Sequence, residues 1–278
     1  MCIVNYVKIN SQNMRYLSGL LLLCHTALAL AQPDPFPKVA ASYLVEINGA
    51  PVWEKRGNRR LPPASLTKMM TALLTVEQHQ PQAVATVSNA AAHESGTRLR
   101  LKEGEKFHVE DLLAAALITS ANDACHALAD HLAGNQTKFV QLMNHRAKKL
   151  GMHNTHFANA CGHDAKDHYS SAHDLALLAN ELIKHPQVIE LTAKADARIT
   201  TLDGAHSYSF ASKNALIGRY PGALGLKTGY TPNAGKCLVV YAKRGDTGVL
   251  LVMLHGYDRW WDAADILDIA FGRAHQPS

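Results

Sequence analysis

The sequence predicts an α/β protein of the α+β kind, in which an antiparallel sheet flanked by helices holds an inserted helical lobe. Apolar and β-branched runs occur near both ends of the chain, at 42–47, 237–242 and 249–254, and such runs favour strands. Between them, residues 109–185 carry apolar side chains at mostly helical spacing. The 278 residues are enough for one large core or for two closely packed ones.

The first 31 residues have the pattern of a secretory signal peptide. Lys8 and Arg15 form a positively charged region, residues 17–30 are mostly apolar, and small residues follow at the expected cleavage position. The apolar run is too short for a comfortable membrane span. An uncleaved anchor is the alternative, and Met14 is a second candidate start codon. We therefore expect export to the periplasm, followed in the chain by a proline-containing linker at 32–38.

A hairpin is the first element expected after the linker. Residues 42–47 are strand-like, Asn48 and Gly49 form a typical two-residue turn, and residues 51–55 can supply the return strand. A polar loop then leads to Ser65, where the sequence predicts the start of a helix. Two prolines precede this serine, and proline is tolerated at or just before a helix start.

Helical patterns dominate the middle of the chain. Apolar residues recur at helical spacing and glycines fall where two of the helices should stop. We expect helices at about 110–118, 123–133, 139–150 and 175–182.

The last part of the chain returns to strands. A short strand is expected at 225–228, two longer ones at 237–242 and 249–254, and a turn between these at 244–248. Residues 260–271 are expected to form a terminal helix.

We therefore expect one domain over 39–278, with a sheet part at about 39–80 and 196–278 and a helical lobe at about 81–195. The net charge of +5 falls to +3 without the two basic residues of the leader. This charge is too small and too scattered to indicate a nucleic-acid-binding protein.

Histidine and cysteine usage predicts neither a metal site nor a cofactor. None of the sixteen histidines falls in a His-Glu-x-x-His or Cys-x-x-Cys pattern, so we expect most of them at the surface. Without the leader, Cys125, Cys161 and Cys237 remain. An odd number leaves at least one thiol free or paired between chains, and whether a disulfide forms stays open.

Ser65 and Lys68 form the pair with the clearest chemical meaning. On a helix, residues three apart share a face, so the serine hydroxyl and the lysine amine can meet. A serine needs a base within hydrogen-bond reach to become a nucleophile, and a lysine can be that base when burial or another cation lowers its pKa. Alone, the pair also fits a helix-capping serine and a solvated lysine.

Two later motifs change this balance. Ser120, Ala121 and Asn122 form a Ser-x-Asn motif in a turn between two apolar helices, and Lys-Thr-Gly occurs at 227–229 on a predicted strand. Together with Ser-x-x-Lys, and in this order, the three motifs are typical of penicillin-binding proteins and class A β-lactamases.

Over residues 39–272 the sequence resembles the low-molecular-mass penicillin-binding proteins, which are serine D-alanyl-D-alanine carboxypeptidases of the S11 type. The serine β-lactamase/DD-peptidase fold is therefore expected. The further matching segments are PASLTKMMTA at 63–72, LKEG at 101–104, FV at 139–140, MN at 143–144, LGM at 150–152, THF at 155–157, YSSAHDLA at 169–176 and KTGYT at 227–231.

Three departures from the family pattern stand out. Ala121 occupies a position where relatives usually have Gly, and NACGH at 159–163 replaces a more usual Asn-Pro-x-Gly-Leu, which leaves the shape of one loop in doubt. The C-terminal β domain and amphipathic tail of many relatives are absent from the sequence, which resembles the short, catalytic-domain-only members. Some of those act as endopeptidases on peptide cross-links.

The resemblance implies a catalytic role for four residues. Ser65 would attack the carbonyl of a D-Ala-D-Ala bond and form an acyl-enzyme, and Lys68 would take its proton. Lys227 would help to lower the Lys68 pKa by like-charge repulsion. Ser120 would relay a proton toward the leaving amine, and Asn122 would orient Lys68 and the substrate amide.

The same resemblance implies a substrate-binding set. Lys227 and Thr228 would bind the terminal carboxylate, and the backbone N–H groups of Ser65 and Tyr230 would hold the oxyanion. Arg259 resembles a family arginine near the carboxylate site, with a surface arginine at a helix start as the alternative. The expected substrate-binding residues are Lys227, Thr228, Gly229, Tyr230 and Arg259.

Peptidoglycan stem peptides are the expected substrate, β-lactams are the expected covalent inhibitors, and peripheral association with the cell envelope is expected. Three other functions remain open: a D,D-endopeptidase, a β-lactamase and a non-catalytic peptidoglycan-binding protein. Class A β-lactamases use a glutamate for deacylation, but residues 161–169 contain Asp164 and Asp167 and no Glu. We therefore expect slow release of bound penicillin.

Overall fold

The computed structural model describes residues 34–78 and 82–274. The signal peptide predicted at 1–31 and the candidate start codon Met14 lie outside the described residues. Part of the predicted linker is packed, because Phe36 is buried and its ring meets the Trp53 ring edge-on at 5.5 Å. The described residues fall within one compact unit, Asp34–Ser278.

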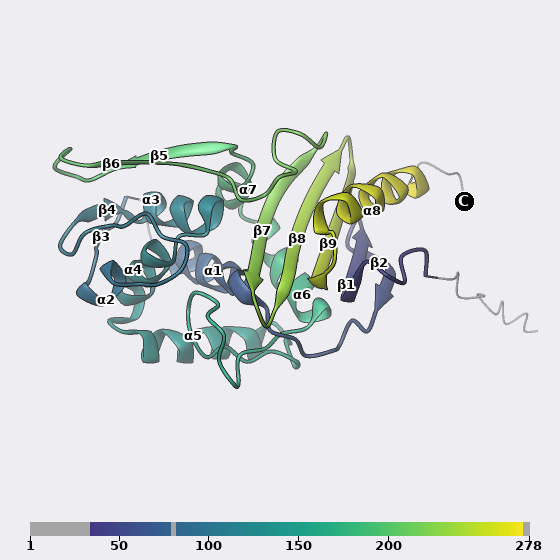
Figure 1. The fold of residues 1–278 in the computed structure, drawn as a ribbon, viewed down its shortest axis with the longest axis horizontal. Helices are drawn as coiled ribbons and strands as arrows, with labels where there is room; N and C mark the ends of the chain where they lie inside the picture. The colour runs from purple at the N-terminus through teal and green to yellow at the C-terminus, as the bar shows by residue number, and fades with distance from the viewer. Residues whose placement is uncertain (1–33, 79–81, 275–278) are drawn as a thin grey trace, which may run out of the picture. The chain divides into compact units, whose positions relative to one another are not determined.

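The main sheet has five antiparallel strands in the order β2-β1-β9-β8-β7 (Figure 1). Its strands come from both ends of the described chain, as the sequence predicts, and Leu44 of β1 lies opposite Val252 of β9. The strands are β1 (Ala40–Ile47), β2 (Ala50–Lys55), β7 (Ala223–Thr231), β8 (Gly235–Arg244) and β9 (Thr247–Gly256).

Period-two alternation gives this sheet two apolar faces. On β9, Leu250 and Val252 belong to the core shared with the helical lobe, whereas Leu251 and Met253 belong to a second core. Helix α8 (Arg259–Ala274) closes the second core, and it lies across the sheet in Figure 1. The sheet is therefore covered by helices on both faces.

The helical lobe is built from short helices whose ends have identifiable causes. Gly134 in a left-handed conformation ends one helix, and the Asn135 side chain then caps the next by accepting from the Lys138 N–H. The helices are α1 (Lys68–Gln78), α2 (Asn89–Ala92), α3 (Val109–Ala114), α4 (Asn122–Ala133), α5 (Gln136–Lys149), α6 (Ala172–Ile183) and α7 (Pro186–Thr192).

Two small antiparallel sheets complete the fold. Strand β3 (Val84–Thr86) pairs with β4 (Lys106–His108), and β5 (Asp196–Thr200) pairs with β6 (Ser207–Ala211). The four strands β3 to β6 and the helices α2 and α7, which are all short, were not predicted from the sequence.

Two predicted helices differ from expectation where the motifs lie. Ser65 is not in the α-helix that the sequence predicts: it lies in a 3-10 turn, η1 (Ala64–Thr67), and α1 begins only at Lys68. The turn is tighter because its hydrogen bonds span three residues, as from the Leu66 N–H to the Pro63 carbonyl at 3.2 Å, and Ala64 within it has a left-handed φ of 49°. Similarly, α3 continues as a π-helical turn, η2 (Ala115–Thr119), before Ser120.

The fold class predicted from the sequence is confirmed: helices pack on an antiparallel sheet made from both ends of the chain. Within residues 34–78 and 82–274, no helix has the length and apolar composition that crossing a bilayer requires.

Candidate active site

A chain of hydrogen bonds through Thr67 and His168 holds the turn that carries Ser65. Thr67 Oγ1 donates to the Ala64 carbonyl at 2.7 Å and lies 2.7 Å from His168 Nε2. His168 Nδ1 accepts from the Ala158 N–H at 2.9 Å. The proton of a neutral ring is therefore on Nε2 and points to Thr67. Burial lowers the pKa of His168 to about 4, which keeps the ring neutral.

Lys68 is fully buried, and its amine meets three oxygens. It lies 2.7 Å from Asn122 Oδ1, 2.6 Å from the Cys161 carbonyl and 3.1 Å from Ser65 Oγ. Burial lowers the pKa of Lys68 to about 7, although the charges of Glu94 and Asp123 raise it. In a neutral amine, two N–H groups satisfy the two carbonyl-type acceptors, and the lone pair is left for the Ser65 hydroxyl.

Burial, one of the two causes expected from the sequence, is the largest cause of the lowered Lys68 pKa. The second expected contribution, repulsion from Lys227, is not among the causes at Lys68. Repulsion is instead a cause at Lys227 itself, whose pKa is lowered by burial first and then by Lys68 and Arg259. Lys68 and Arg259 are therefore close enough to Lys227 for their charges to lower its pKa.

Asn122 is fixed on both sides of its amide. Oδ1 accepts from Lys68, and Nδ2 donates to the Ser95 carbonyl at 2.6 Å. Ser120 lies two residues earlier, between η2 and α4, where it is 8% exposed and adopts a left-handed φ of 66°. The predicted turn between two buried helices is confirmed for Ser120, whereas Asn122 is the first residue of α4. The proton-relay role of Ser120 stays a prediction.

Strand β7 lies directly against the Ser65 turn. A Cβ atom added to Gly229 would be 3.2 Å from the Ser65 main-chain nitrogen. Alternate residues of a strand share a side, so Lys227 lies on the same side as Gly229. Lys227 is buried, and its amine donates to the Thr228 carbonyl at 2.9 Å. Tyr230, one residue past Gly229, is 63% exposed.

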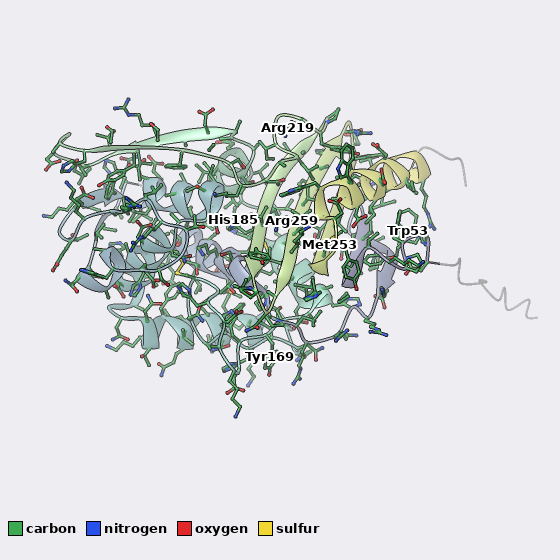
Figure 2. The ribbon with its side chains drawn as sticks, in the orientation of Figure 1. Trp53, Tyr169, His185, Arg219, Met253 and Arg259 are labelled. Carbon is green, nitrogen blue, oxygen red and sulfur yellow. A yellow bond between two sulfur atoms is a disulfide. The ribbon has the colours of Figure 1, made fainter. Side chains whose placement is uncertain are left out.

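Arg259 reaches the sheet from the start of α8 (Figure 2). Its Nη1 donates to the Gly229 carbonyl at 2.7 Å and to the Cys237 carbonyl at 3.1 Å. Among the residues that the structure describes, its buried Nε has no hydrogen-bond partner. The side chain is therefore packed against the sheet instead of lying free at the surface, and its role toward the substrate carboxylate stays a prediction.

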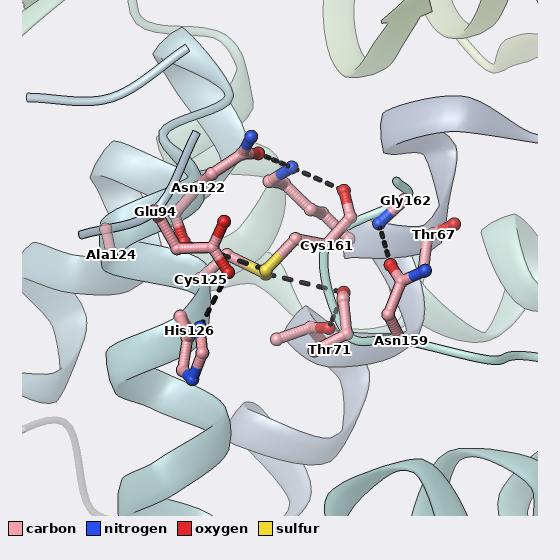
Figure 3. Close-up of a disulfide and its surroundings, with 12 residues drawn as sticks. Thr67, Thr71, Glu94, Asn122, Ala124, Cys125, His126, Asn159, Cys161 and Gly162 are labelled. Atoms are coloured by element: carbon pink, nitrogen blue, oxygen red, sulfur yellow. Dashed lines mark hydrogen bonds and ion pairs between the residues drawn. A yellow bond between two sulfur atoms is a disulfide. The ribbon is translucent and has the colours of Figure 1, made fainter. Parts of the chain in front are cut away.

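The loop at 159–163, whose shape the sequence left in doubt, forms the other wall of the site. A disulfide joins its Cys161 to Cys125 of α4 (Figure 3), and Cys237 is a buried free thiol. Asn159 Oδ1 accepts from the Gly162 N–H at 2.7 Å. Gly162 has a φ of 91°, and a Cβ atom there would overlap the Ala64 carbonyl. This loop therefore packs against the Ser65 turn through bare backbone.

Glu94 is the carboxylate whose charge raises the Lys68 pKa most. It is held by His126 Nδ1 at 2.6 Å and by His163 Nε2 at 2.9 Å. Burial raises the pKa of Glu94, but the hydrogen bonds from both histidines hold it well below its usual range. Glu94, Asp123 and His168 were not predicted as site residues from the sequence. Asp123 directly follows the Ser-x-Asn motif, but no local pattern marks the other two.

The described part of the chain shows no cluster of side chains that could hold a metal ion. A cavity of about 320 Å³ lies between α1, α3, α7 and β5, and none of the predicted site residues lines it. The site is therefore defined by the convergence of η1, η2, α4, the 159–163 loop and β7 around Lys68.

Comparison with known proteins agrees with this geometry. The sequence model of Peptidase_S11, D-alanyl-D-alanine carboxypeptidase, matches residues 32–257. The chain is 33% identical over 272 residues to D-alanyl-D-alanine carboxypeptidase DacF of Bacillus subtilis, covering 92% of this chain and 70% of that protein. For DacC of Escherichia coli the identity is 35%, over 84% of this chain and 61% of that protein. The D-alanyl-D-alanine endopeptidase of Escherichia coli is 27% identical, over 86% and 78%.

Solved structures show the same fold. The D-alanyl-D-alanine carboxypeptidase of Mycobacterium tuberculosis superposes with a TM-score of 0.80 at 29% identity, covering 87% of this chain and 93% of that chain. Penicillin-binding protein D2 of Listeria monocytogenes, in an ampicillin-bound form, gives a TM-score of 0.73 at 33% identity, over 84% and 97%.

Proposed function

The chain belongs to the Peptidase S11 family of D-alanyl-D-alanine carboxypeptidases, and from this we propose that it hydrolyses the D-Ala-D-Ala bond of peptidoglycan stem peptides through an acyl-enzyme on Ser65. One observation carries the proposal. The buried Lys68 amine lies 3.1 Å from Ser65 Oγ, and two carbonyl oxygens occupy its other hydrogen bonds. That arrangement fits a neutral base aimed at a nucleophile.

The proposed acylation begins with proton transfer from Ser65 to Lys68. Ser65 Oγ then forms a bond to the carbonyl carbon, and the bond to the D-Ala nitrogen breaks as that nitrogen takes a proton, relayed through Ser120. Water later cleaves the ester and restores the hydroxyl. Asn122 keeps Lys68 in place throughout, because both ends of its amide are held.

The substrate's terminal carboxylate should bind beside Lys227 and Arg259, the cations of the site next to β7. Lys227 is a residue of β7, and Arg259 reaches the same strand from α8, where its buried Nε has no hydrogen-bond partner among the described residues. Strand β7 is an outer strand of its sheet, so it can pair with an extended peptide. Thr228 and the backbone of Gly229 and Tyr230 would then line the bound substrate, with the N–H groups of Ser65 and Tyr230 toward the oxyanion.

β-Lactams should acylate the same serine, as the ampicillin-bound relative suggests. The acyl-enzyme should persist. Asp164, one of two acids available for activating water in residues 161–169, accepts a hydrogen bond from Thr231 at 2.8 Å. Rapid nitrocefin turnover would instead favour a β-lactamase.

Endopeptidase action on cross-links is the second candidate, because it uses the same acyl-enzyme chemistry and one similar protein carries that name. We place the protein in the periplasm, and the Cys125–Cys161 disulfide fits an oxidising compartment. The division into a sheet part and a helical lobe within 39–278, and peripheral envelope association, remain part of this proposal.

A single incubation tests these candidates. The purified protein is mixed with pentapeptide muropeptides and with cross-linked dimers, and the products are followed by mass. We expect loss of one D-Ala from the pentapeptide, whereas cleavage of dimers alone would favour the endopeptidase. Ser65→Ala should form no covalent penicillin adduct while keeping its circular dichroism spectrum. An adduct on this variant would refute the nucleophile assignment.

A further inference from the structure

We infer that the Cys125–Cys161 disulfide is a positioning device for the Lys68 base, so that the oxidised form is the active enzyme and reduction slows acylation. This inference rests on the proposed function, since it concerns the same serine and lysine.

The bridge joins the two segments that hold the Lys68 amine. Asn122, whose Oδ1 accepts one hydrogen bond, begins α4, and Cys125 follows in the first turn of the same helix. The second acceptor is the carbonyl of Cys161, so one cysteine supplies both a half of the bridge and a contact with the base. Both cysteines are buried, at 0% and 2% exposure. Figure 3 shows the bridge with Asn122 on one side and Gly162 on the other.

Without the bridge, this loop would be held by the packing of Gly162 on the Ala64 carbonyl, by the contact of Cys161 Sγ with the Asn122 carbonyl at 3.7 Å and by a few hydrogen bonds. Thr71 Oγ1 donates to the Ala160 carbonyl at 2.8 Å, and His163 meets Glu94 at 2.9 Å. The hydrogen bonds of Asn159 with Gly162 and His163 lie within the loop and do not tie it to another element. The His163 side chain is 37% exposed, so its ion pair competes with water. Neither link fixes the Cys161 carbonyl itself.

Reduction should act on Lys68 in two ways. The Cys161 carbonyl loses its covalent anchor, and a displacement of about 1 Å in a catalytic group can cost on the order of 100-fold in rate. A looser loop also admits water, and burial is the largest cause of the lowered Lys68 pKa. The charged groups facing Lys68 are Glu94, Asp123 and Lys227. None of them is removed by reduction, so the loss of burial sets the direction and the pKa rises.

The test compares acylation by a fluorescent penicillin, from pH 6 to 9, in oxidised protein and in protein treated with a dithiol. The dithiol gives two electrons and two protons to the bridge, which yields two cysteine thiols and the cyclic disulfide of the reagent. Alkylation followed by mass measurement counts the thiols. We expect the rate constant to fall about 10- to 100-fold, the acid limb of the pH profile to move to higher pH, and reoxidation to restore both.

Two variants control the experiment. The double variant Cys125→Ser with Cys161→Ser should be slow and should not respond to the dithiol. Cys237→Ala keeps the bridge, so it should show the parent's fold-change on reduction. A change of less than about twofold in the parent would overturn the inference. A loss of rate that follows loss of the circular dichroism spectrum, with no shift of the acid limb, would also overturn it, because the bridge would then serve only the fold.

The outcome also separates this inference from the proposed function. If oxidised and reduced protein are acylated equally well, the inference alone fails. If neither form is acylated, the proposed function fails and the inference fails with it.

Discussion

The amide of Asn122 is turned so that its oxygen faces Lys68 at 2.7 Å and its nitrogen faces the Ser95 carbonyl at 2.6 Å. This contact joins the start of α4 to the start of α1. Because the Asn122 oxygen can only accept, one N–H of the Lys68 amine must point toward it. The Cys161 carbonyl takes a second N–H, and Ser65 is left for the lone pair.

The first prediction concerns the pH dependence of acylation. Lys68 must be neutral to accept the Ser65 proton, and burial lowers its pKa to about 7. The rate of penicillin acylation should therefore rise as pH increases through about 7 and level off above it. A stopped-flow or gel measurement with fluorescent penicillin between pH 5 and 9 checks this. A profile that stays flat across that interval would contradict the role of Lys68 as the base.

Asn122→Asp should move this profile. The new carboxylate keeps the shape of the amide but places a negative charge beside Lys68, which favours the ammonium and raises its pKa. A rise of about one unit in the Lys68 pKa lowers the fraction of neutral amine at pH 7 by up to about tenfold. The acylation rate at pH 7 should therefore drop by about the same factor and should recover at higher pH. Asn144→Asp adds the same charge in α5, where Asn144 bonds to Phe157, and it should leave the acid limb in place. Equal shifts in both variants would count against a local effect.

Gly162→Ala should disturb the Ser65 turn from outside. Both the φ of 91° and the overlap of a Cβ atom with the Ala64 carbonyl oppose the substitution. Gly49→Ala is the matched control, because Gly49 has a φ of 79° but no atom within 4 Å of an added Cβ. Each should lose about 1 kcal/mol or more of stability from strain, but only Gly162→Ala should lower acylation, by about tenfold or more. Thermal melts and penicillin labelling measure the two effects, and normal labelling of Gly162→Ala would show that the close contact is not needed.

Stability should depend on His168 in acid. The folded-state pKa is lowered from 6.5 to about 4 by burial, so the unfolded chain binds a proton more readily. The resulting stability is present above about pH 6.5 and is lost as pH falls toward 4, amounting to about 3 kcal/mol. Urea unfolding at pH 7 and 4.5 should show a smaller acid loss in His168→Gln than in the parent. Identical losses would mean that His168 is protonated or solvated in the folded protein.

Arg259→Gln should weaken substrate binding more than chemistry. The side chain touches the Gly229 and Cys237 carbonyls and keeps a free buried Nε. Loss of a charged donor at a carboxylate site should raise KM for a D-Ala-D-Ala peptide about tenfold, with a smaller change in kcat. Arg244→Gln is the control, since Arg244 lies over the Tyr220 and Phe271 rings and meets Asp268. The assignment would be wrong if KM rose equally in both variants.

Much of the fold followed from the sequence, because periodicity and turn residues act locally. The Asn48–Gly49 hairpin, the C-terminal strands and the four main lobe helices lie where apolar spacing places them. The 3-10 turn at Ser65 did not follow, since its left-handed Ala64 is set by β7 and the 159–163 loop, which pack on it from distant parts of the chain.

The site shows the same division. The motifs predicted Lys68, Asn122 and Ser65 together, and their contacts confirm that these three converge. Glu94 and the Cys161 carbonyl could not be found by motif, because a carbonyl has no sequence signature and Glu94 lies in an otherwise polar loop. The Cys125–Cys161 pairing likewise depends on tertiary structure, which cysteine counting cannot supply.

The strand order has a consequence for how the protein is made. Strand β1 lies between β2 and β9, so its second partner is synthesised long after β1 itself. Contacts between residues so distant in sequence raise the contact order of the fold, and a high contact order slows folding. Strand β7, which completes the Ser65 site, is joined to that sheet through β8 and β9. Catalytic competence should therefore be among the last properties that the folding chain acquires.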